Sequence, residues 1–436
     1  MSSSLTTTRV LARDLARHTG QTVTLKGWVQ SCRHLGGLAF VILRDRSGVA
    51  QVVLEGELAA RPLPEEAVVA VTGEVAADPR AVGGAEVRAS ALEVLSAPTR
   101  VPPFEINKKT LKASLETILE HRAFALRHPR IGAALRVQAA LIEGFRNYLA
   151  GQGFLEVRTP KIVATGTEGG ANLFPVQYFE QRAFLAQSPQ LYKQMLVGAG
   201  YERVFEVGPA YRAEDHNTSR HLSEFTSLDV EMGFIDSEED LMDLETELLR
   251  SMFAHVAERS AAELDLLGAR VPEVPGRIER IPVHEAHEIL RRRYRKVSPE
   301  GDLDTEGERL ICQYVAGEGR PPLVFITRYP ASVRPFYSFP DPDRPGLTRT
   351  FDLLLAGQEI TSGGQRIHDP EVLRESLRRR GLDPAGFQHY LEIFELGMPP
   401  HGGFAIGAER LTALVLGLGN AREAAAFPRD RTRLVP

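Results

Sequence analysis

Five short segments between residues 22 and 95 carry the β-branched residues and imperfect apolar/polar alternation that are typical of β-strands. Turns that contain glycine separate them. The five segments are residues 22–32, 38–48, 49–56, 67–77 and 85–95. Strands this short and this closely spaced favour a small closed barrel of the OB-fold type, whose sheet face binds single-stranded nucleic acid. A fragment of a β-sandwich without such a role is the structural alternative.

The character of the sequence changes after this region. Residues 96–122 contain three prolines followed by a polar helical run, which is typical of a linker. The apolar spacing of residues 129–152 predicts a long amphipathic helix. Residues 153–163 are expected to contain a strand that ends at a proline, and apolar strands then alternate with helices. The pattern predicts an α+β chain with a barrel at residues 1–100, a linker at 101–120 and a second domain at 121–436.

One segment of the second domain, residues 272–320, is rich in charge and is expected to be peripheral. Its run Arg291–Lys296, "RRRYRK", has two interpretations. The run either contacts RNA phosphates or, as we favour, forms the solvated face of a helix.

Composition limits the compartment and the partners. The 436 residues are 43% hydrophobic and 25% charged, and no apolar run approaches the roughly 20 residues of a membrane span. A net charge of −5 argues against a uniformly basic nucleic-acid binder but permits local basic patches. The Ser/Thr-rich start with three arginines resembles a transit peptide, but a short helix leading into a strand at Val23 leaves no room for cleavage. Cys32 and Cys312 stand far apart, so we expect a reducing cytoplasm and no structural zinc.

The stretch Tyr211–Phe225, "YRAEDHNTSRHLSEF", joins two apolar strand-like segments through a very polar loop. Arg212 and Glu214 lie two residues apart, so in an extended strand they face the same side and share one pocket. An arginine fork suits bidentate binding of phosphate or carboxylate, and the ring of Phe225 offers a stacking surface. A salt-bridged hairpin is the alternative, although the loop is longer than a minimal hairpin needs.

Two other segments before this stretch carry candidate ligand-binding residues. Glu168 lies beside paired glycines, which allow the backbone to move or to approach a ligand closely, although a surface turn is the simpler interpretation. Lys193 stands in an apolar helical segment. It is either a cation held for an anionic ligand or a side chain that snorkels toward water.

The C-terminal part places four polar residues around a Gly-Gly turn: Asp352, Glu359, Ser362 and Arg366. Carboxylates and a hydroxyl are hard oxygen ligands that can hold Mg²⁺. A Gly-rich strand then leads into a helix expected to begin near Ala408, with Arg410 in its first turn. No GxxxxGK[ST] and no GxGxxG sequence occurs, so an ATP site in this chain would use arginines on strands.

Together these segments resemble the three signature motifs of the class II aminoacyl-tRNA synthetases. Residues 136–160 look like motif 1, residues 203–232 like motif 2 and residues 401–417 like motif 3. The barrel resembles the anticodon-binding domain of the Asp/Asn/Lys subgroup, and the whole pattern is most similar to the compact archaeal and eukaryotic aspartyl enzymes. The resemblance implies an antiparallel sheet flanked by helices, a homodimer formed through motif 1, and a site for ATP and Mg²⁺.

The resemblance also implies roles around ATP. Arg212 would hold the α-phosphate during in-line attack by the amino acid, Glu214 would read the adenine amino group, and Phe225 would stack on the ring. The other implied phosphate-binding residues are Arg220 and His221 at the β/γ-phosphates and Arg410 on the opposite side. The implied Mg²⁺ ligands are Asp352, Glu359 and Ser362. These roles amount to catalysis by positioning and electrostatics, without a protein nucleophile.

The identity of the amino acid is implied by two basic residues. In the family, the lysine of "QLYKQ" and the arginine of "SGGQR" bind the side-chain carboxylate of aspartate; here they are Lys193 and Arg366. Asparaginyl enzymes typically read "QLYLE" instead, and a neutral amide would leave two buried cations without a counter-charge, which costs several kcal/mol. Glutamate would be excluded by pocket size, at roughly 1–3 kcal/mol. The remaining residues implied at the amino acid are Glu168 at its ammonium, Gln190 at its α-carboxylate, Asp229 beside Lys193, and Ser362.

The identity of the tRNA is implied by the barrel. Phe40 would stack on the central anticodon base and Gln51 would hydrogen-bond it, and such stacking contributes roughly 1–3 kcal/mol. Strictly tRNA(Asp)-specific archaeal enzymes carry a tryptophan where this chain has Gln30 and a lysine where it has Pro79. Both departures predict an enzyme that also charges tRNA(Asn) with aspartate, after which a tRNA-dependent amidotransferase would complete Asn-tRNA(Asn).

Other interpretations stay open at this point. The presence of Lys193 argues against an asparaginyl-tRNA synthetase. An enzyme specific for tRNA(Asp) would differ from the favoured interpretation only in its barrel residues. An ATP-dependent asparagine synthetase on the same catalytic fold would lack the barrel. A degenerate paralogue that only binds RNA or a partner would have lost motif residues. The motif residues that are present are Arg212, Glu214, Glu359, Arg366 and Arg410.

Overall fold

A computed structural model describes residues 8–166, 172–215 and 218–436 of the chain. The chain divides into two compact units, Met1–Ser114 and Leu115–Pro436, each with a hydrophobic core of its own. Within the described ranges, no helix combines the length and the apolar character needed to cross a membrane.

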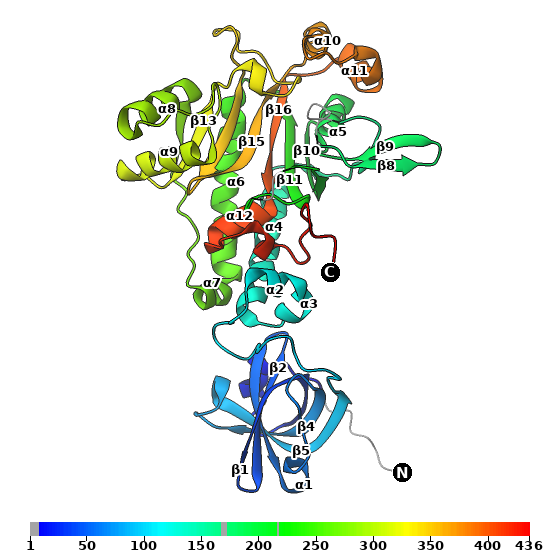
Figure 1. Ribbon diagram of the computed structural model, residues 1–436, viewed down its shortest axis with the longest axis vertical. Coiled ribbons are helices and arrows are strands. Elements are labelled where there is room, and N and C mark those ends of the chain that lie inside the picture. The colour runs from blue at the N-terminus through cyan, green and yellow to red at the C-terminus, as the bar shows by residue number, and fades with distance from the viewer. Residues whose placement is uncertain (1–7, 167–171, 216–217) are drawn as a thin grey trace. The chain divides into compact units, whose positions relative to one another are not determined.

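The first unit is a closed five-stranded barrel (Figure 1). Its elements are a 3₁₀ helix at Ala12–His18, β1 (Thr22–Leu35), β2 (Leu38–Asp45), β3 (Gly48–Glu55), α1 (Gly56–Ala59), β4 (Val68–Ala77) and β5 (Ala85–Ser96). The strand order is β1-β2-β3-β5-β4, and only the β3–β5 pair is parallel. Alternate apolar residues such as Val23, Leu25 and Val29 fill the interior. The predicted OB-type barrel of five strands is confirmed.

Two glycines permit the strands of the barrel to approach closely. A Cβ atom on Gly27 would lie 2.2 Å from the backbone oxygen of Arg44, and one on Gly73 would lie 2.1 Å from that of Arg88. No other residue fits at either position without moving a neighbouring strand.

The second unit is a sheet flanked by helices (Figure 1). Its helices are α2 (Leu115–Glu120), α3 (Arg122–Ala125), α4 (Pro129–Gly151), α5 (Gln190–Leu196), α6 (Glu238–Arg259), α7 (Ala261–Leu267), α8 (Val283–Ile289), α9 (Thr305–Gly317), α10 (Pro370–Arg379), α11 (Gln388–Glu395) and α12 (Ala408–Leu416). Its strands are β6 (Leu155–Glu156), β7 (Ile162–Val163), β8 (Pro175–Tyr178), β9 (Gln181–Leu185), β10 (Arg203–Tyr211), β11 (Glu224–Gly233), β12 (Glu279–Pro282), β13 (Leu323–Thr327), β14 (Thr350–Leu355), β15 (Gln358–Arg366) and β16 (His401–Gly407). The main sheet has the order β12-β13-β14-β15-β16-β11-β10-β6 and is antiparallel except at its two outermost pairs, and β7-β9-β8 form a small second sheet.

The helices α4 and α6 pack closely against each other and contribute to the main core. Their approach depends on Gly144 of α4, where a Cβ atom would lie 3.1 Å from the Cα atom of Met252 in α6. Helix α6 begins at a capping box, in which Ser237 accepts from the first turn and Asp240 accepts from the backbone of Ser237. The long helix predicted at residues 129–152 and the helix predicted to begin near Ala408 are both confirmed.

Three local predictions were wrong. The strand predicted at 153–163 is split between β6 and β7, which belong to different sheets. The Gly363–Gly364 pair is not a turn but lies inside β15, where a Cβ atom on Gly363 would lie 2.7 Å from Cζ of Phe351 and from Cβ of Phe404. The segment 272–320 is not only peripheral, since it adds β12 to the main sheet and an apolar cluster with α8 and α9. Its arginines Arg291–Arg293 are exposed, as a solvated face requires.

Helix α6 carries a buried carboxyl group, Glu245, which should make the stability of the protein depend on pH. Burial raises the pKa of Glu245 to about 8, a hydrogen bond with the side chain of Thr361 opposes this shift, and the negative charge of Asp352 adds to it. The folded chain therefore holds this proton where the unfolded chain releases it. We expect the free energy of unfolding to fall as pH rises from about 4.5 to about 8, by at most about 1.4 kcal/mol per pH unit.

Glu245→Gln, which stays neutral, should remove this slope and be more stable than the wild type at pH 8. Glu247→Gln is the matched control, because Glu247 lies on the same helix with its side chain 52% exposed. Parallel urea-unfolding profiles for the wild type and Glu245→Gln between pH 5 and pH 8 would contradict the assignment.

Candidate active site

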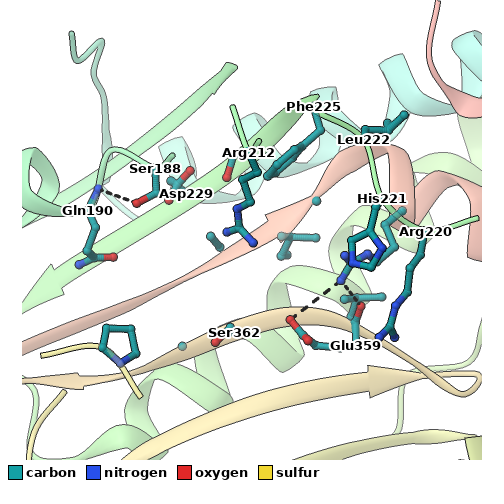
Figure 2. Close-up of a pocket in the computed structure, with 18 of the residues that line it drawn as sticks. Ser188, Gln190, Arg212, Arg220, His221, Leu222, Phe225, Asp229, Glu359 and Ser362 are labelled. Atoms are coloured by element: carbon teal, nitrogen blue, oxygen red, sulfur yellow. Dashed lines mark hydrogen bonds and ion pairs between the residues drawn. The ribbon is translucent and has the colours of Figure 1, made fainter. Parts of the chain in front are cut away.

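A pocket of about 250 Å³ lies over the middle of the main sheet, between the β10–β11 hairpin and the β15–β16 strands with α12. The predicted site residues that line it are Gln190, Arg212, Glu214, Arg220, His221, Phe225, Asp229, Glu359, Ser362, Arg366 and Arg410. Figure 2 shows it running from Gln190 and Asp229 at one end, past Arg212 and Phe225, to Arg220, His221 and Glu359. Asp352 lies in an adjoining polar cavity of about 210 Å³. Glu168 lies outside the described residues.

The middle of the pocket carries a stacked arginine. The guanidinium carbon of Arg212 lies 5.4 Å from the ring centroid of Phe225, and its Nη1 lies 3.9 Å from Oε1 of Glu214. Its Nε is buried and has no hydrogen-bond partner among the described residues. Because β10 ends at Tyr211, Arg212 and Glu214 lie just beyond the strand, yet both line the pocket. A buried donor without a partner is costly and is satisfied when an anionic ligand binds.

The far end holds two more arginines and a histidine. Nη1 of Arg220 lies 2.8 and 3.2 Å from the carboxylate oxygens of Glu308 on α9. Nη1 of Arg410 donates to the backbone oxygen of Glu359 at 2.9 Å and lies 3.9 Å from its carboxylate. Nε2 of His221 lies 3.3 Å from the carboxylate of Glu214. Arg220 and Arg410 are thus held by protein oxygens at the edge of the pocket.

The predicted Mg²⁺ ligands lie side by side on β14 and β15. Asp352 and Ser362 are direct partners in the strand register, and Arg334 donates to both, at 2.9 Å to Asp352 Oδ1 and 3.0 Å to Ser362 Oγ. Burial, and then the charges of Asp352 and Glu308, raise the pKa of Glu359 to about 7 despite Arg410 and Arg334. Carboxylates that repel one another in this way are stabilised by a divalent cation.

This donor set fits Mg²⁺, which proteins usually hold through one or two carboxylates together with substrate phosphates. The described residues contain no cluster of three or more His, Cys, Asp or Glu side chains that could hold a metal ion.

The other end of the pocket is built on a buried lysine. Nζ of Lys193 is fully buried behind the pocket wall and donates to Asp229 Oδ1 at 2.9 Å and to the backbone oxygen of Val230 at 3.2 Å. It also lies 3.4 Å from Glu231 Oε2. The snorkelling alternative for this lysine is therefore wrong, because its side chain is 0% exposed.

Arg366 completes this buried cluster. It donates to Glu231 Oε1 at 3.1 Å, to Gln190 Oε1 at 3.2 Å and to the backbone oxygen of Gly403 at 2.9 Å. Burial alone would raise the pKa of Glu231, but the charges of Arg366 and Lys193 outweigh it and hold that pKa below its usual value. Each cation thus has a protein carboxylate beside it, so the expectation that both would lack a counter-charge without a substrate carboxylate was wrong.

Sequence reasoning missed several residues of the site: Glu231, Glu308, Arg334 and Tyr337. Glu231 had a usable signal, because it follows Asp229 by two residues on β11 and so shares its face. Arg334 and Glu308 lie in a loop and in a charged helix, and no local pattern distinguishes them from solvated residues.

The barrel places two of its predicted residues together. Phe40 of β2 and Gln51 of β3 lie on the outer face, because Phe40 pairs with Val53 and Ile42 with Gln51, and their neighbours on each strand point inward. Gln51 donates to Glu86 Oε2 at 2.8 Å. Gln30 lies at an irregularity of β1, where the register with β2 shifts between Val29 and Ser31. Pro79 is exposed in the β4–β5 connection.

These features agree with known protein families. The family described as "tRNA synthetases class II (D, K and N)" matches residues 114–431, which is most of the chain. The chain belongs to the class II aminoacyl-tRNA synthetases. The family described as "OB-fold nucleic acid binding domain" matches residues 23–95 of this synthetase. The resemblance inferred from the sequence motifs is therefore confirmed.

Relatives of the synthetase differ in their amino acid and tRNA. It is 54% identical to the aspartate–tRNA(Asp/Asn) ligase of Thermus thermophilus, over 98% of this chain and 100% of that protein. It is 44% identical to the aspartate–tRNA(Asp) ligase of Pyrococcus abyssi, over 96% of this chain and 97% of that protein. The crystal structure of asparaginyl-tRNA synthetase from Pyrococcus horikoshii with asparaginyl-adenylate has a TM-score of 0.89 and 34% identity, over 96% and 97% of the two chains.

Proposed function

We propose that the synthetase is an aspartate–tRNA ligase that charges both tRNA(Asp) and tRNA(Asn). An oxygen of the aspartate α-carboxylate attacks the α-phosphorus of ATP, the bond to pyrophosphate breaks, and the aspartyl group then passes from AMP to the 3′ end of the tRNA. The observation that carries the choice of amino acid is Lys193, buried against Asp229 and Glu231 at the end of the pocket.

Lys193 favours aspartate through the carboxylates that it occupies. An asparagine amide needs an acceptor for its NH₂ group; at this end Asp229 lines the pocket, and Glu231 lies 3.4 Å from the same lysine. With Lys193 and Arg366 donating to them, these carboxylates have less capacity to accept from an amide. The guanidinium of Arg366, which lines the pocket, suits a substrate carboxylate instead.

The remaining residues of the pocket would bind ATP. Arg212 would take the α-phosphate, Glu214 and Phe225 the adenine, and Arg410 the opposite face. Arg220 and His221 would hold the β/γ-phosphates. Mg²⁺, held by Glu359, Ser362 and Asp352, would neutralise phosphate charge, which requires Arg334 to share Asp352 with the metal. Gln190 would lie at the substrate α-carboxylate and Glu168 at its ammonium.

We also propose partners for the enzyme. Phe40 and Gln51 of the barrel would read the central anticodon base. Motif 1, which contains much of α4, would form a homodimer. The enzyme would act in the cytoplasm, and aspartyl-tRNA(Asn) would pass to a tRNA-dependent amidotransferase.

The purified enzyme should catalyse aspartate-dependent ATP–pyrophosphate exchange and charge transcripts of both tRNA(Asp) and tRNA(Asn) with aspartate. Exchange with asparagine should stay at background. The Thermus relative, named for both tRNAs, shares more identity with this chain than the tRNA(Asp)-named Pyrococcus relative. If tRNA(Asn) stays uncharged at enzyme levels that charge tRNA(Asp), the enzyme is specific for tRNA(Asp).

A barrel variant tests where the tRNA preference arises. Gln30→Trp combined with Pro79→Lys should lower charging of tRNA(Asn) roughly tenfold or more relative to tRNA(Asp), since one stacking contact is worth about 1–3 kcal/mol. Aspartate-dependent exchange without tRNA should not change, and it serves as the internal control. An unchanged tRNA(Asn)/tRNA(Asp) ratio would exclude these two positions as determinants.

A further inference from the structure

The ion pair between Arg220 and Glu308 has a second anchor that ties it to the opposite wall of the site. Glu308 Oε2, which lies 2.8 Å from Arg220 Nη1, also accepts from the backbone N–H of Glu359 at 3.2 Å. One carboxylate on α9 therefore joins the segment before β11 to strand β15. Both side chains are largely shielded from water, with 21% and 6% exposure, so solvent and salt screen this contact less than a surface pair.

The pair leaves most of the arginine available. Glu308 contacts only Nη1 of Arg220, and the described residues include no hydrogen-bond partner for its Nη2 or Nε. Arg220 also lines both the main pocket and the adjoining polar cavity. Glu308 thus holds one nitrogen of the guanidinium, and the arginine still lines the space where a ligand would lie.

Arg220 itself lies in a turn rather than in a strand, so the backbone alone does not fix its long side chain. A loop arginine loses side-chain freedom when it binds a ligand, and an anchor that removes this freedom beforehand lowers the cost of binding. Glu308 also accepts a hydrogen bond from the backbone of Glu359. It therefore fixes the position of Arg220 relative to Glu359, which is a proposed Mg²⁺ ligand.

We propose that Glu308 is a positioning residue, which holds Arg220 in the orientation that meets the β/γ-phosphates of ATP. The inference rests on the proposed function. It gives the segment 272–320, which is remote in sequence from all three motifs, a part in amino-acid activation through Arg220.

The test is a double-mutant cycle measured by ATP–pyrophosphate exchange. Glu308→Gln keeps the size of the side chain and an acceptor for Glu359 N–H but removes the charge. We expect a roughly tenfold rise in the KM for ATP, with the KM for aspartate unchanged. Glu308→Gln combined with Arg220→Ala should match Arg220→Ala alone, because glutamine still accepts from Glu359 N–H and the contact that the change weakens is the one with Arg220.

Asp304→Asn is the matched control. Asp304 caps the same helix and pairs with Lys296 at 2.6 Å, but it does not line the pocket, and asparagine can still accept from Gly307 N–H. Its KM for ATP should equal that of the wild type. If Glu308→Gln does not fold, the cycle is repeated with Glu308→Asp, which is too short to reach Arg220 and should show the same rise.

Two outcomes would overturn the inference: a KM for ATP within about twofold of the wild type, or effects of the two single changes that simply add. A structural role alone would predict additive effects and equal losses for both substrates. Absence of aspartate-dependent exchange in the wild type would instead reject the proposed function, so the two failures are distinguishable.

Discussion

Lys193→Met should abolish aspartate activation, with a loss of at least about 100-fold in kcat/KM for aspartate, because a buried charged interaction is worth roughly 3 kcal/mol or more. The change removes the cation that lies 2.9 Å from Asp229 and 3.4 Å from Glu231. Asp229 would then lose its cation while Glu231 keeps Arg366, and the excess negative charge would repel the substrate carboxylate. Aspartate-dependent ATP–pyrophosphate exchange measures this loss directly.

Loss of stability must be separated from loss of binding in this variant. Leaving Asp229 buried without its cation destabilises the fold by about 3–5 kcal/mol, and adding Asp229→Asn should recover much of that in urea unfolding. The double variant should fold well and still fail to activate aspartate. Lys161→Met is the matched control, because Lys161 also pairs with a buried carboxylate, Glu206, at 2.9 Å but lies outside the pocket. Near-normal exchange in folded Lys193→Met would show that the carboxylate-binding assignment is wrong.

The fold was predictable where apolar residues recurred with the period of a strand or helix and a local turn or proline marked the end of the element. The barrel strands, α4 and the β10–β11 pair are such elements, and each lies within a few residues of its predicted range. The Gly363–Gly364 pair shows the limit of this reasoning. Glycine usually marks a turn, but here both residues lie within a strand. Phe351 and Phe404 leave no room for a Cβ atom on Gly363, and Arg349 and Thr350 leave none on Gly364. Only the packing of three neighbouring strands determines that outcome.

The site residues that lie in recognisable sequence segments could be predicted, whereas those in the charged segment between them could not. Lys193 stood out because a lysine in an apolar helix needs an explanation, and the structure gives one in Asp229 and Glu231. Glu308 did not stand out, because the first turn of α9 contains other acidic residues and all are favourable near a helix N-terminus. Its contact with Arg220 spans 88 positions of sequence, and no local pattern records a contact of that range.

Arg212→Ala should lower kcat/KM for ATP in the exchange reaction by about 100- to 1,000-fold, the effect of removing one donor that stabilises charge in a transition state. The loss should appear mainly in kcat, because the negative charge at the α-phosphorus develops during the attack. Arg212 is prepared for this role by its stack on Phe225 at 5.4 Å and by the buried Nε that has no partner among the described residues. Arg212→Lys keeps the charge but not the fork and should recover only part of the rate.

Arg203→Ala controls for the loss of an arginine from the same hairpin. Arg203 begins β10 and lies over the ring of Phe154 at 5.6 Å, which matches the stacking of Arg212, but it is not among the residues that line the pocket. Its removal should leave exchange unchanged. A loss of less than tenfold in folded Arg212→Ala would mean that another cation holds the α-phosphate. Arg410 and Arg366 line the same pocket and would be the next to test. Because Arg366 is bonded to Glu231 and Gln190, only Arg410 could be removed without also disturbing the aspartate end.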